Sequence, residues 1–171
     1  LKGFKAGTEI ETSFTPSADG PVVAYAFKRQ YEAQGGDTTW LRVFSGSMKA
    51  GDNLECSDGR NTERMGQLSV AQGKSRDKID VAGPGDIVLA AKLKATHTGV
   101  TLTSGVDFAF PPIQYAVPTS TDAISPVISG DDDKMAAGLH RIMEEDPTFQ
   151  LIHQGHLSQT LLATQGEIHT N

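Results

Sequence analysis

Short apolar runs separated by turn residues dominate the first two thirds of the chain. The run at 21–31 is continuously apolar from Pro21 to Phe27, which predicts a strand that is buried on both faces. The run at 38–45 alternates apolar and polar residues, and this alternation predicts a half-buried strand. Gly46 and Gly51 follow it, and they predict tight turns because glycine readily adopts a positive φ.

Further short strands are predicted before residue 110, at the spacing of about 8–12 residues that is typical of β-sandwiches and barrels. They span residues 53–56, 62–70, 87–91 and 98–103. Gly66 interrupts one of them, so we expect a bulge or a close backbone approach there. No helical periodicity is evident in this region, and the sequence therefore predicts an all-β barrel at 15–110 after a lead-in or linker at 1–14.

The pattern changes at Phe110-Pro111-Pro112. A strand, a helix, two strands and the start of a helix are predicted beyond it. These elements span residues 113–117, 131–146, 149–153, 159–164 and 165–171. Apolar residues recur at helical spacing from Met135 to Met143, and Pro147 ends the helix. This order predicts a partial ferredoxin-like α+β domain at 111–171, with its last helix and strand beyond Asn171.

Charge is distributed unevenly over the 171 residues, and this supports two domains. Residues 1–110 hold 13 basic and 13 acidic side chains, whereas residues 111–171 hold 2 and 8, so the net charge of −6 lies entirely in the second region. The single cysteine, Cys56, agrees with a reducing cytosol, and we expect a cytoplasmic protein without a membrane partner. A chain that begins without methionine also suggests a fragment of a longer protein.

Several residue clusters could carry chemistry, but each has a simpler explanation. The acidic run at 131–133 could bind Mg²⁺, although helix N-termini favour carboxylates without a metal. His153 and His156 have a spacing that zinc sites use, but no third ligand is evident. Cys56 has no activating neighbour in the sequence. We therefore assign no catalytic, cofactor-binding or metal-binding residue to this chain.

Two nucleotide-binding motifs are absent from the sequence. It contains no Gly-x-x-x-x-Gly-Lys-Ser/Thr phosphate loop and no Asn-Lys-x-Asp. We expect that this chain alone does not bind or hydrolyse GTP by a phosphate-loop mechanism.

A basic segment at 60–78 offers a different kind of site. Its cations are Arg60, Arg64, Lys74, Arg76 and Lys78. They could contact the phosphate backbone of RNA. They could equally form a solvated barrel edge, where lysine and arginine discourage pairing with other strands. The sequence leaves both interpretations open.

Seven short motifs follow one another along the chain, at 41–46, 49–52, 85–87, 98–102, 144–149, 159–162 and 166–169. In this order they resemble the translational GTPases, above all elongation factor G. The first four resemble its second domain, and the last three resemble its third domain. The resemblance covers roughly residues 15–171. Residues 163–169 depart from the family pattern Gly-Met-Gly-Glu-Leu-His, which leaves open a paralogue or a related factor for release, recycling or ribosome protection.

The resemblance implies a non-catalytic part of a larger GTPase that acts in protein synthesis. Domain II would pack on the GTPase domain, which would bind GTP and Mg²⁺, and would contact small-subunit rRNA. Domain III would relay the GTP state to domains IV and V during tRNA and mRNA translocation, and would touch a small-subunit ribosomal protein. The rRNA-contact candidates are Arg42, Lys49, Arg60 and Arg64. The interdomain-contact candidates are Glu144, Glu145, Glu167 and His169.

Two other classes of function remain open from the residues alone. One is a free-standing β-barrel module that binds RNA or protein, and the other is a metal-dependent hydrolase that uses the histidine and aspartate clusters. No DNA partner is expected.

Overall fold

The computed structural model describes residues 1–32, 36–59, 61–73, 75–155 and 159–170. The chain forms two compact units, Leu1–Ile113 and Gln114–Asn171. Within the described residues, no helix combines the length and apolar character that crossing a membrane requires. The boundaries of domains predicted from the sequence stay predictions.

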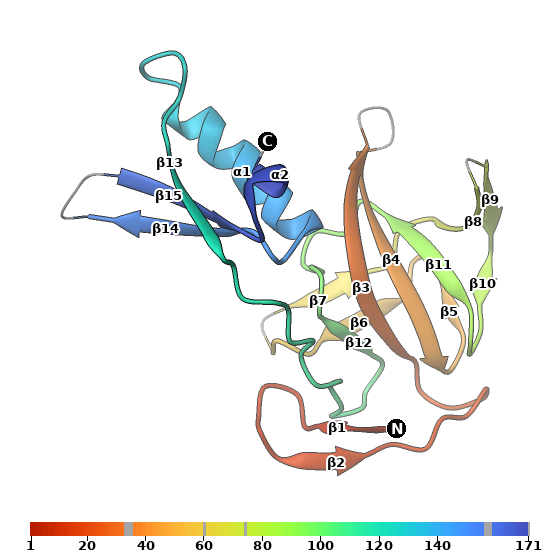
Figure 1. Cartoon of the computed structure of the whole chain (residues 1–171). Helices are drawn as coiled ribbons and strands as arrows, with labels where there is room; N and C mark the ends of the chain where they lie inside the picture. Colours follow the sequence, from red (N-terminus) through yellow and green to blue (C-terminus); the bar gives the residue numbers. More distant parts are fainter. Residues whose placement is uncertain (33–35, 60, 74, 156–158, 171) are drawn as a thin grey trace. The chain divides into compact units, whose positions relative to one another are not determined.

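An antiparallel eight-stranded sheet forms most of the first unit (Figure 1). Its strands lie in the order β7-β6-β12-β3-β4-β11-β8-β9. They are β3 (Val23–Glu32), β4 (Gly36–Ser45), β6 (Asn53–Cys56), β7 (Thr62–Arg64), β8 (Leu68–Gln72), β9 (Ser75–Ile79), β11 (Ile87–Ala91) and β12 (Thr101–Thr103). The short strands β5 (Met48–Lys49) and β10 (Val81–Ala82) pair separately with each other.

One apolar core joins strands from distant positions in this sheet. Leu54 of β6 and Leu68 of β8 belong to the same buried cluster as Leu41 of β4, and Met48 of β5 joins them. Strands near opposite ends of a sheet share one core only if the sheet curls around it. This arrangement confirms the predicted β-barrel-type fold of the first unit.

Gly66 separates two strands that the sequence predicts as one. The predicted strand at 62–70 is wrong in this respect, because the chain leaves the sheet after β7 and enters it again at β8. A Cβ atom at Gly66 would lie 2.1 Å from the carbonyl oxygen of Ala91. The expected close backbone approach is therefore confirmed, and it accounts for the interruption.

The turn after β4 also requires glycine. Gly46 has a φ of +70°, and a Cβ atom there would lie 2.7 Å from the backbone nitrogen of Val22. A side chain is excluded by both its backbone conformation and the lack of space.

The first residues of the chain form a hairpin of β1 (Lys2–Phe4) and β2 (Glu11–Ser13). Backbone hydrogen bonds of 2.8 and 2.7 Å join Phe4 and Ala109 in both directions. The ring of Phe14 lies 5.7 Å from that of Phe108 between centroids. The segment predicted as a lead-in is thus attached to the residues that follow β12.

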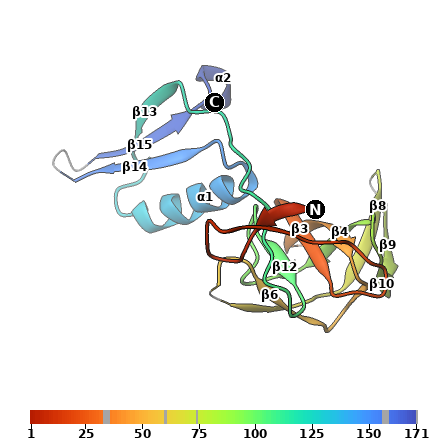
Figure 2. The same cartoon turned by 90° about the horizontal axis from the view of Figure 1, so that it is seen from below.

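The second unit is a three-stranded antiparallel sheet with a helix along one face (Figure 2). Its elements are β13 (Ser120–Ile124), α1 (Asp132–Glu145), β14 (Gln150–Gln154), β15 (Gln159–Thr164) and α2 (Glu167–Thr170). The strand order is β13-β15-β14. The helix predicted at 131–146 and the helix start predicted after residue 165 are confirmed, as is the mixed α and β character of the unit.

The first strand of this unit differs from its prediction. Residues 113–117 are exposed and form no strand, and β13 lies further along the chain at Ser120–Ile124. Backbone pairing with Thr160–Thr164 defines β13, although its sequence is largely polar. An edge strand needs only one neighbour, so an apolar pattern is not required.

Asp146 joins the end of α1 to α2. Its carboxylate accepts hydrogen bonds from the backbone nitrogen and hydroxyl of Thr148, at 2.9 and 2.6 Å. Nε2 of His169 lies 3.1 Å from the same carboxylate. Nδ1 of His169 accepts a hydrogen bond of 3.2 Å from the backbone of Gln165. A neutral imidazole therefore carries its proton on Nε2, facing Asp146.

These contacts shift the titration of Asp146. Partial burial raises its pKa, but the hydrogen bonds from Thr148 and then from His169 lower it by more, so the pKa lies below the ordinary value of 3.8. The ionised carboxylate is the form that these donors stabilise.

We predict that Gly66→Ala destabilises the first unit by about 1–3 kcal/mol, because the added methyl group would overlap the Ala91 carbonyl and displace the backbone. Denaturant unfolding followed by Trp40 fluorescence measures the change. Gly83→Ala is the matched control, since its Cβ would meet only Asp86 Oδ2, at 3.9 Å. Equal stability of the two variants would contradict this role for Gly66.

We also predict an acid-sensitive contribution to the second unit. A lowered pKa in the folded state stabilises the unit above the unfolded value and loses that effect as the pH falls through the folded value. Asp146→Asn should cost up to about 1 kcal/mol near neutral pH, a small effect because the carboxylate is partly exposed. The difference from wild type should vanish at acid pH. Unfolding monitored by circular dichroism across pH tests this, and a pH-independent difference would contradict it.

Candidate nucleic-acid interface

Three of the four rRNA-contact candidates lie on exposed positions of the first unit, and Arg60 lies outside the described residues. Arg42 is on β4, Lys49 is on β5 and Arg64 is on β7. Strands β4 and β7 are separated in the sheet by β3, β12 and β6, while β5 pairs only with β10 among the described strands. The three cations therefore do not belong to neighbouring strands of one sheet.

Arg42 is oriented by an aromatic side chain. Its guanidinium carbon lies 5.3 Å from the ring centroid of Phe44, a cation–π contact worth about 0.5–1 kcal/mol at an exposed site. Phe44 in turn packs against Phe110, with 4.6 Å between the ring centroids, and Phe110 packs against Phe108, with 5.1 Å between the centroids. A row of packed rings thus holds this cation at the surface.

A buried carboxylate was not identified from the sequence. Glu63 of β7 is 5% exposed, between the exposed residues Thr62 and Arg64. It accepts hydrogen bonds from the backbone nitrogens of Lys94, Ala95 and Thr96, at 3.2, 2.6 and 2.8 Å. The hydroxyl of Thr96 adds a fourth, at 3.0 Å. Alternation along this strand was the available signal, because it places Glu63 on the inward face.

Arg29 of β3 binds two backbone carbonyls of the segment whose amides Glu63 binds. Its guanidinium donates to the carbonyl oxygens of Thr96 and Leu93, at 3.3 and 3.4 Å. It also forms an ion pair with Asp37 at 3.1 Å. We call residues 92–97 the clamped loop, because Glu63 binds its amides and Arg29 binds its carbonyls.

The interdomain-contact candidates lie at the end of α1 and on α2. Glu144 and Glu145 are exposed residues in the last turn of α1, and Glu167 is exposed at the start of α2. His169 is half-buried, bonds Asp146 and packs against Phe149, with 4.0 Å between ring centroids. The structure therefore brings His169 to the end of α1, while the role of all four residues in contacts between domains stays a prediction.

The clusters considered for metal binding have other contacts. Asp131 bonds Lys134 at 2.8 Å, and Nδ1 of His153 lies 3.2 Å from the hydroxyl of Thr160. His156 lies outside the described residues. Among the residues that the structure describes, no three candidate ligands gather in a way that could hold a metal ion.

Cys56 is buried, and that burial, together with the nearby charge of Asp58, raises the pKa of its thiol to about 11. The thiol is therefore protonated near neutral pH and is a weak nucleophile.

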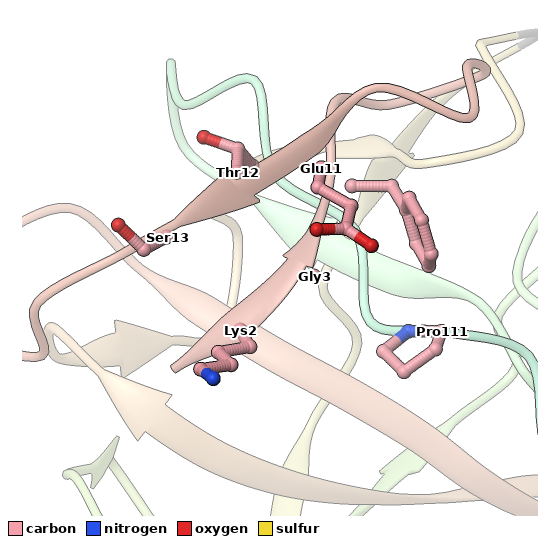
Figure 3. Close-up of a pocket in the computed structure, with 7 residues that line it drawn as sticks. Lys2, Gly3, Glu11, Thr12, Ser13 and Pro111 are labelled. Carbon is pink, nitrogen blue, oxygen red and sulfur yellow. The ribbon is translucent and has the colours of Figure 1, made fainter.

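A hollow of about 520 Å³ lies beside the β1–β2 hairpin (Figure 3). Lys2 and Glu11 contribute opposite charges to its lining, and Pro111 contributes an apolar surface. Both charged side chains are exposed. Ligand sites usually combine an enclosed apolar surface with a few convergent polar groups, and this hollow lacks that combination. We assign no ligand to it.

The chain matches two family models in consecutive order. Elongation factor G domain 2 matches residues 21–105, and Elongation Factor G, domain III, matches residues 115–171. The sequence is also 34% identical over 171 residues to Elongation factor G of Jannaschia sp. (strain CCS1), covering 98% of this chain and 24% of that protein.

Solved structures show the same similarity. A crystal structure of a protein from Thermus thermophilus has a TM-score of 0.73 and 30% sequence identity, covering 89% of this chain and 23% of that one. The chain spans about a quarter of the length of either relative. Its two matches lie in order and cover most of its residues, and the chain therefore belongs to the elongation factor G family, with domain 2 followed by domain III.

Proposed function

We propose that this chain is the ribosome-docking and relay region of an elongation factor G-like translational GTPase. The observation that carries the proposal is the ordered match to domains 2 and III over two separate compact units. The chemistry of GTP hydrolysis would belong to another domain, which would hold GTP and Mg²⁺. The chain itself would bind and position, without breaking a bond.

The first unit would dock on small-subunit rRNA. Arg42, Lys49 and Arg64 are exposed on strands of a barrel whose core is shared across the sheet. Exposed cations on such a scaffold can contact phosphates with little loss of conformational freedom. Arg60 would act with them by its position in the sequence.

The second unit would relay the nucleotide state to domains IV and V. The hydrogen bond between Asp146 and His169 joins α1 to α2, and rigid units transmit rearrangements better than loosely joined elements. Glu144, Glu145 and Glu167 would contact the GTPase domain or domains IV and V, and the unit would also face a small-subunit ribosomal protein. The step served would be tRNA and mRNA translocation in the cytoplasm, with ribosome recycling or protection as the alternative.

We predict that Arg42→Glu combined with Arg64→Glu, in the full-length protein that contains this chain, lowers affinity for purified small ribosomal subunits at least about tenfold at low salt, or about 1.4 kcal/mol. Like charges would then face the phosphates that the wild-type cations attract. Sedimentation with labelled protein measures the affinity.

Lys2→Glu combined with Lys5→Glu is the control, because it changes the net charge equally at exposed positions of the N-terminal segment. Its affinity should stay within about twofold of wild type, since surface substitutions away from a contact rarely exceed about 0.5 kcal/mol. An equal loss in both variants would show a general charge effect and would refute the assigned docking surface. Failure of the wild-type protein to bind ribosomes would refute the proposed function.

A further inference from the structure

The clamped loop is held in one conformation by two buried or partly buried charges. Glu63 accepts hydrogen bonds from three consecutive amides, and Arg29 donates to two carbonyls of the same six residues. Lys92 has a φ of +59°, which is rare for a residue with a side chain. Backbone strain of this kind persists only where surrounding contacts enforce it.

Some side chains of the clamped loop are buried in the barrel, and others are exposed. Leu93 and Thr96 are 2% and 0% exposed. Lys92, Lys94 and His97 are exposed. No residue of 92–97 carries a carboxylate, so the exposed surface of the loop has the positive charges of Lys92 and Lys94 beside the imidazole of His97. The clamp therefore fixes a small basic surface at the connection between β11 and β12.

We propose that the clamped loop contacts an RNA phosphate backbone, with Lys92 and Lys94 as phosphate-binding residues and Glu63 and Arg29 as positioning residues. This inference rests on the proposed docking of the first unit on ribosomal RNA, and it adds a surface that the sequence candidates did not include. Lysine ammonium groups bind phosphate as point charges and need no shaped pocket.

The exposed chemistry of the loop favours RNA over an acidic protein. Protein interfaces place apolar and aromatic side chains at their centre, and their rims are polar. The large apolar side chain of this loop, Leu93, points into the core. The exposed lysines of the loop extend from a backbone that is held in place, and such fixed positive charges suit the regularly spaced phosphates of RNA.

Glu63 and Arg29 would act through the loop rather than by touching RNA. A loop that is already ordered loses less conformational entropy on binding. Glu63→Gln keeps the size of the side chain but replaces one acceptor oxygen with an amide NH₂, which cannot accept from the loop amides. The lysines would remain, but their backbone would no longer be held in place.

The first test removes the charges. In the full-length protein, Lys92→Gln combined with Lys94→Gln should weaken binding to protein-free small-subunit rRNA about tenfold at low salt. Log affinity falls as log salt rises, and the steepness of this fall should decrease by about 2, because each lost phosphate contact removes about 1 from the slope. Lys2→Gln combined with Lys5→Gln is the matched control and should leave the slope unchanged.

The second test separates positioning from folding. Glu63→Gln should make the salt dependence of binding less steep although both lysines are present. Adding the two lysine substitutions to Glu63→Gln should change the slope little further, since all of these substitutions weaken the same contact. Hydrogen exchange should accelerate at the amides of 94–96. If Glu63→Gln does not fold, Arg29→Lys provides the test, because it keeps the charge and loses the planar donor fork.

The outcomes distinguish this inference from the proposed function. If wild-type protein binds rRNA and the lysine variant keeps its slope, the clamped loop is not the contact, while docking by Arg42 and Arg64 stands. Competition by polyglutamate but not by RNA would assign the loop to an acidic protein and overturn the inference. If wild-type protein binds ribosomal subunits with no salt dependence, the charge-based contact is refuted.

Discussion

A single apolar core, shared by strands from distant positions in one sheet, determines the rest of the first unit. Leu54 and Leu68 belong to strands separated by four others, yet both are buried in the same cluster. The sheet must curl to bring them together. Between β7 and β8 the chain also passes close to the end of β11, at the carbonyl of Ala91. Gly66 is the residue that tolerates this crowding, because a side chain there would overlap the carbonyl of Ala91.

The connection between β11 and β12 needs hydrogen-bond partners for its backbone, and charged side chains supply them. The connection after β11 has amides and carbonyls that strand pairing does not satisfy, and buried backbone groups without partners are strongly unfavourable. Glu63 and Arg29 supply those partners from β7 and β3. A buried carboxylate alone would be costly, but four donors surround this one. These two charged side chains therefore hold the loop in one conformation.

The second unit buries fewer apolar residues than the first, and hydrogen bonds contribute more to holding its elements together. No residue of α1 is fully buried, and Leu162 and Ala163 of β15 are the apolar residues of this unit that are buried within the described chain. The central position of β15 follows from pairing with strands on both sides. The hydrogen bond between Asp146 and His169 connects the end of α1 to α2, which follows β15. The two helices of the unit are therefore in direct contact at this point.

The sequence by itself determined the elements with strong local periodicity and the family to which they belong. The strands at 53–56 and 159–164 and the long helix follow from spacing alone, because local side-chain patterns specify them. Only the tertiary structure decided the position of β13, since a polar edge strand is defined by its partner. It also decided that Glu63 and Arg29 meet at one loop, and that Arg42 and Arg64 lie on separated strands. Those relations depend on strand order, which brings together residues that no local pattern connects.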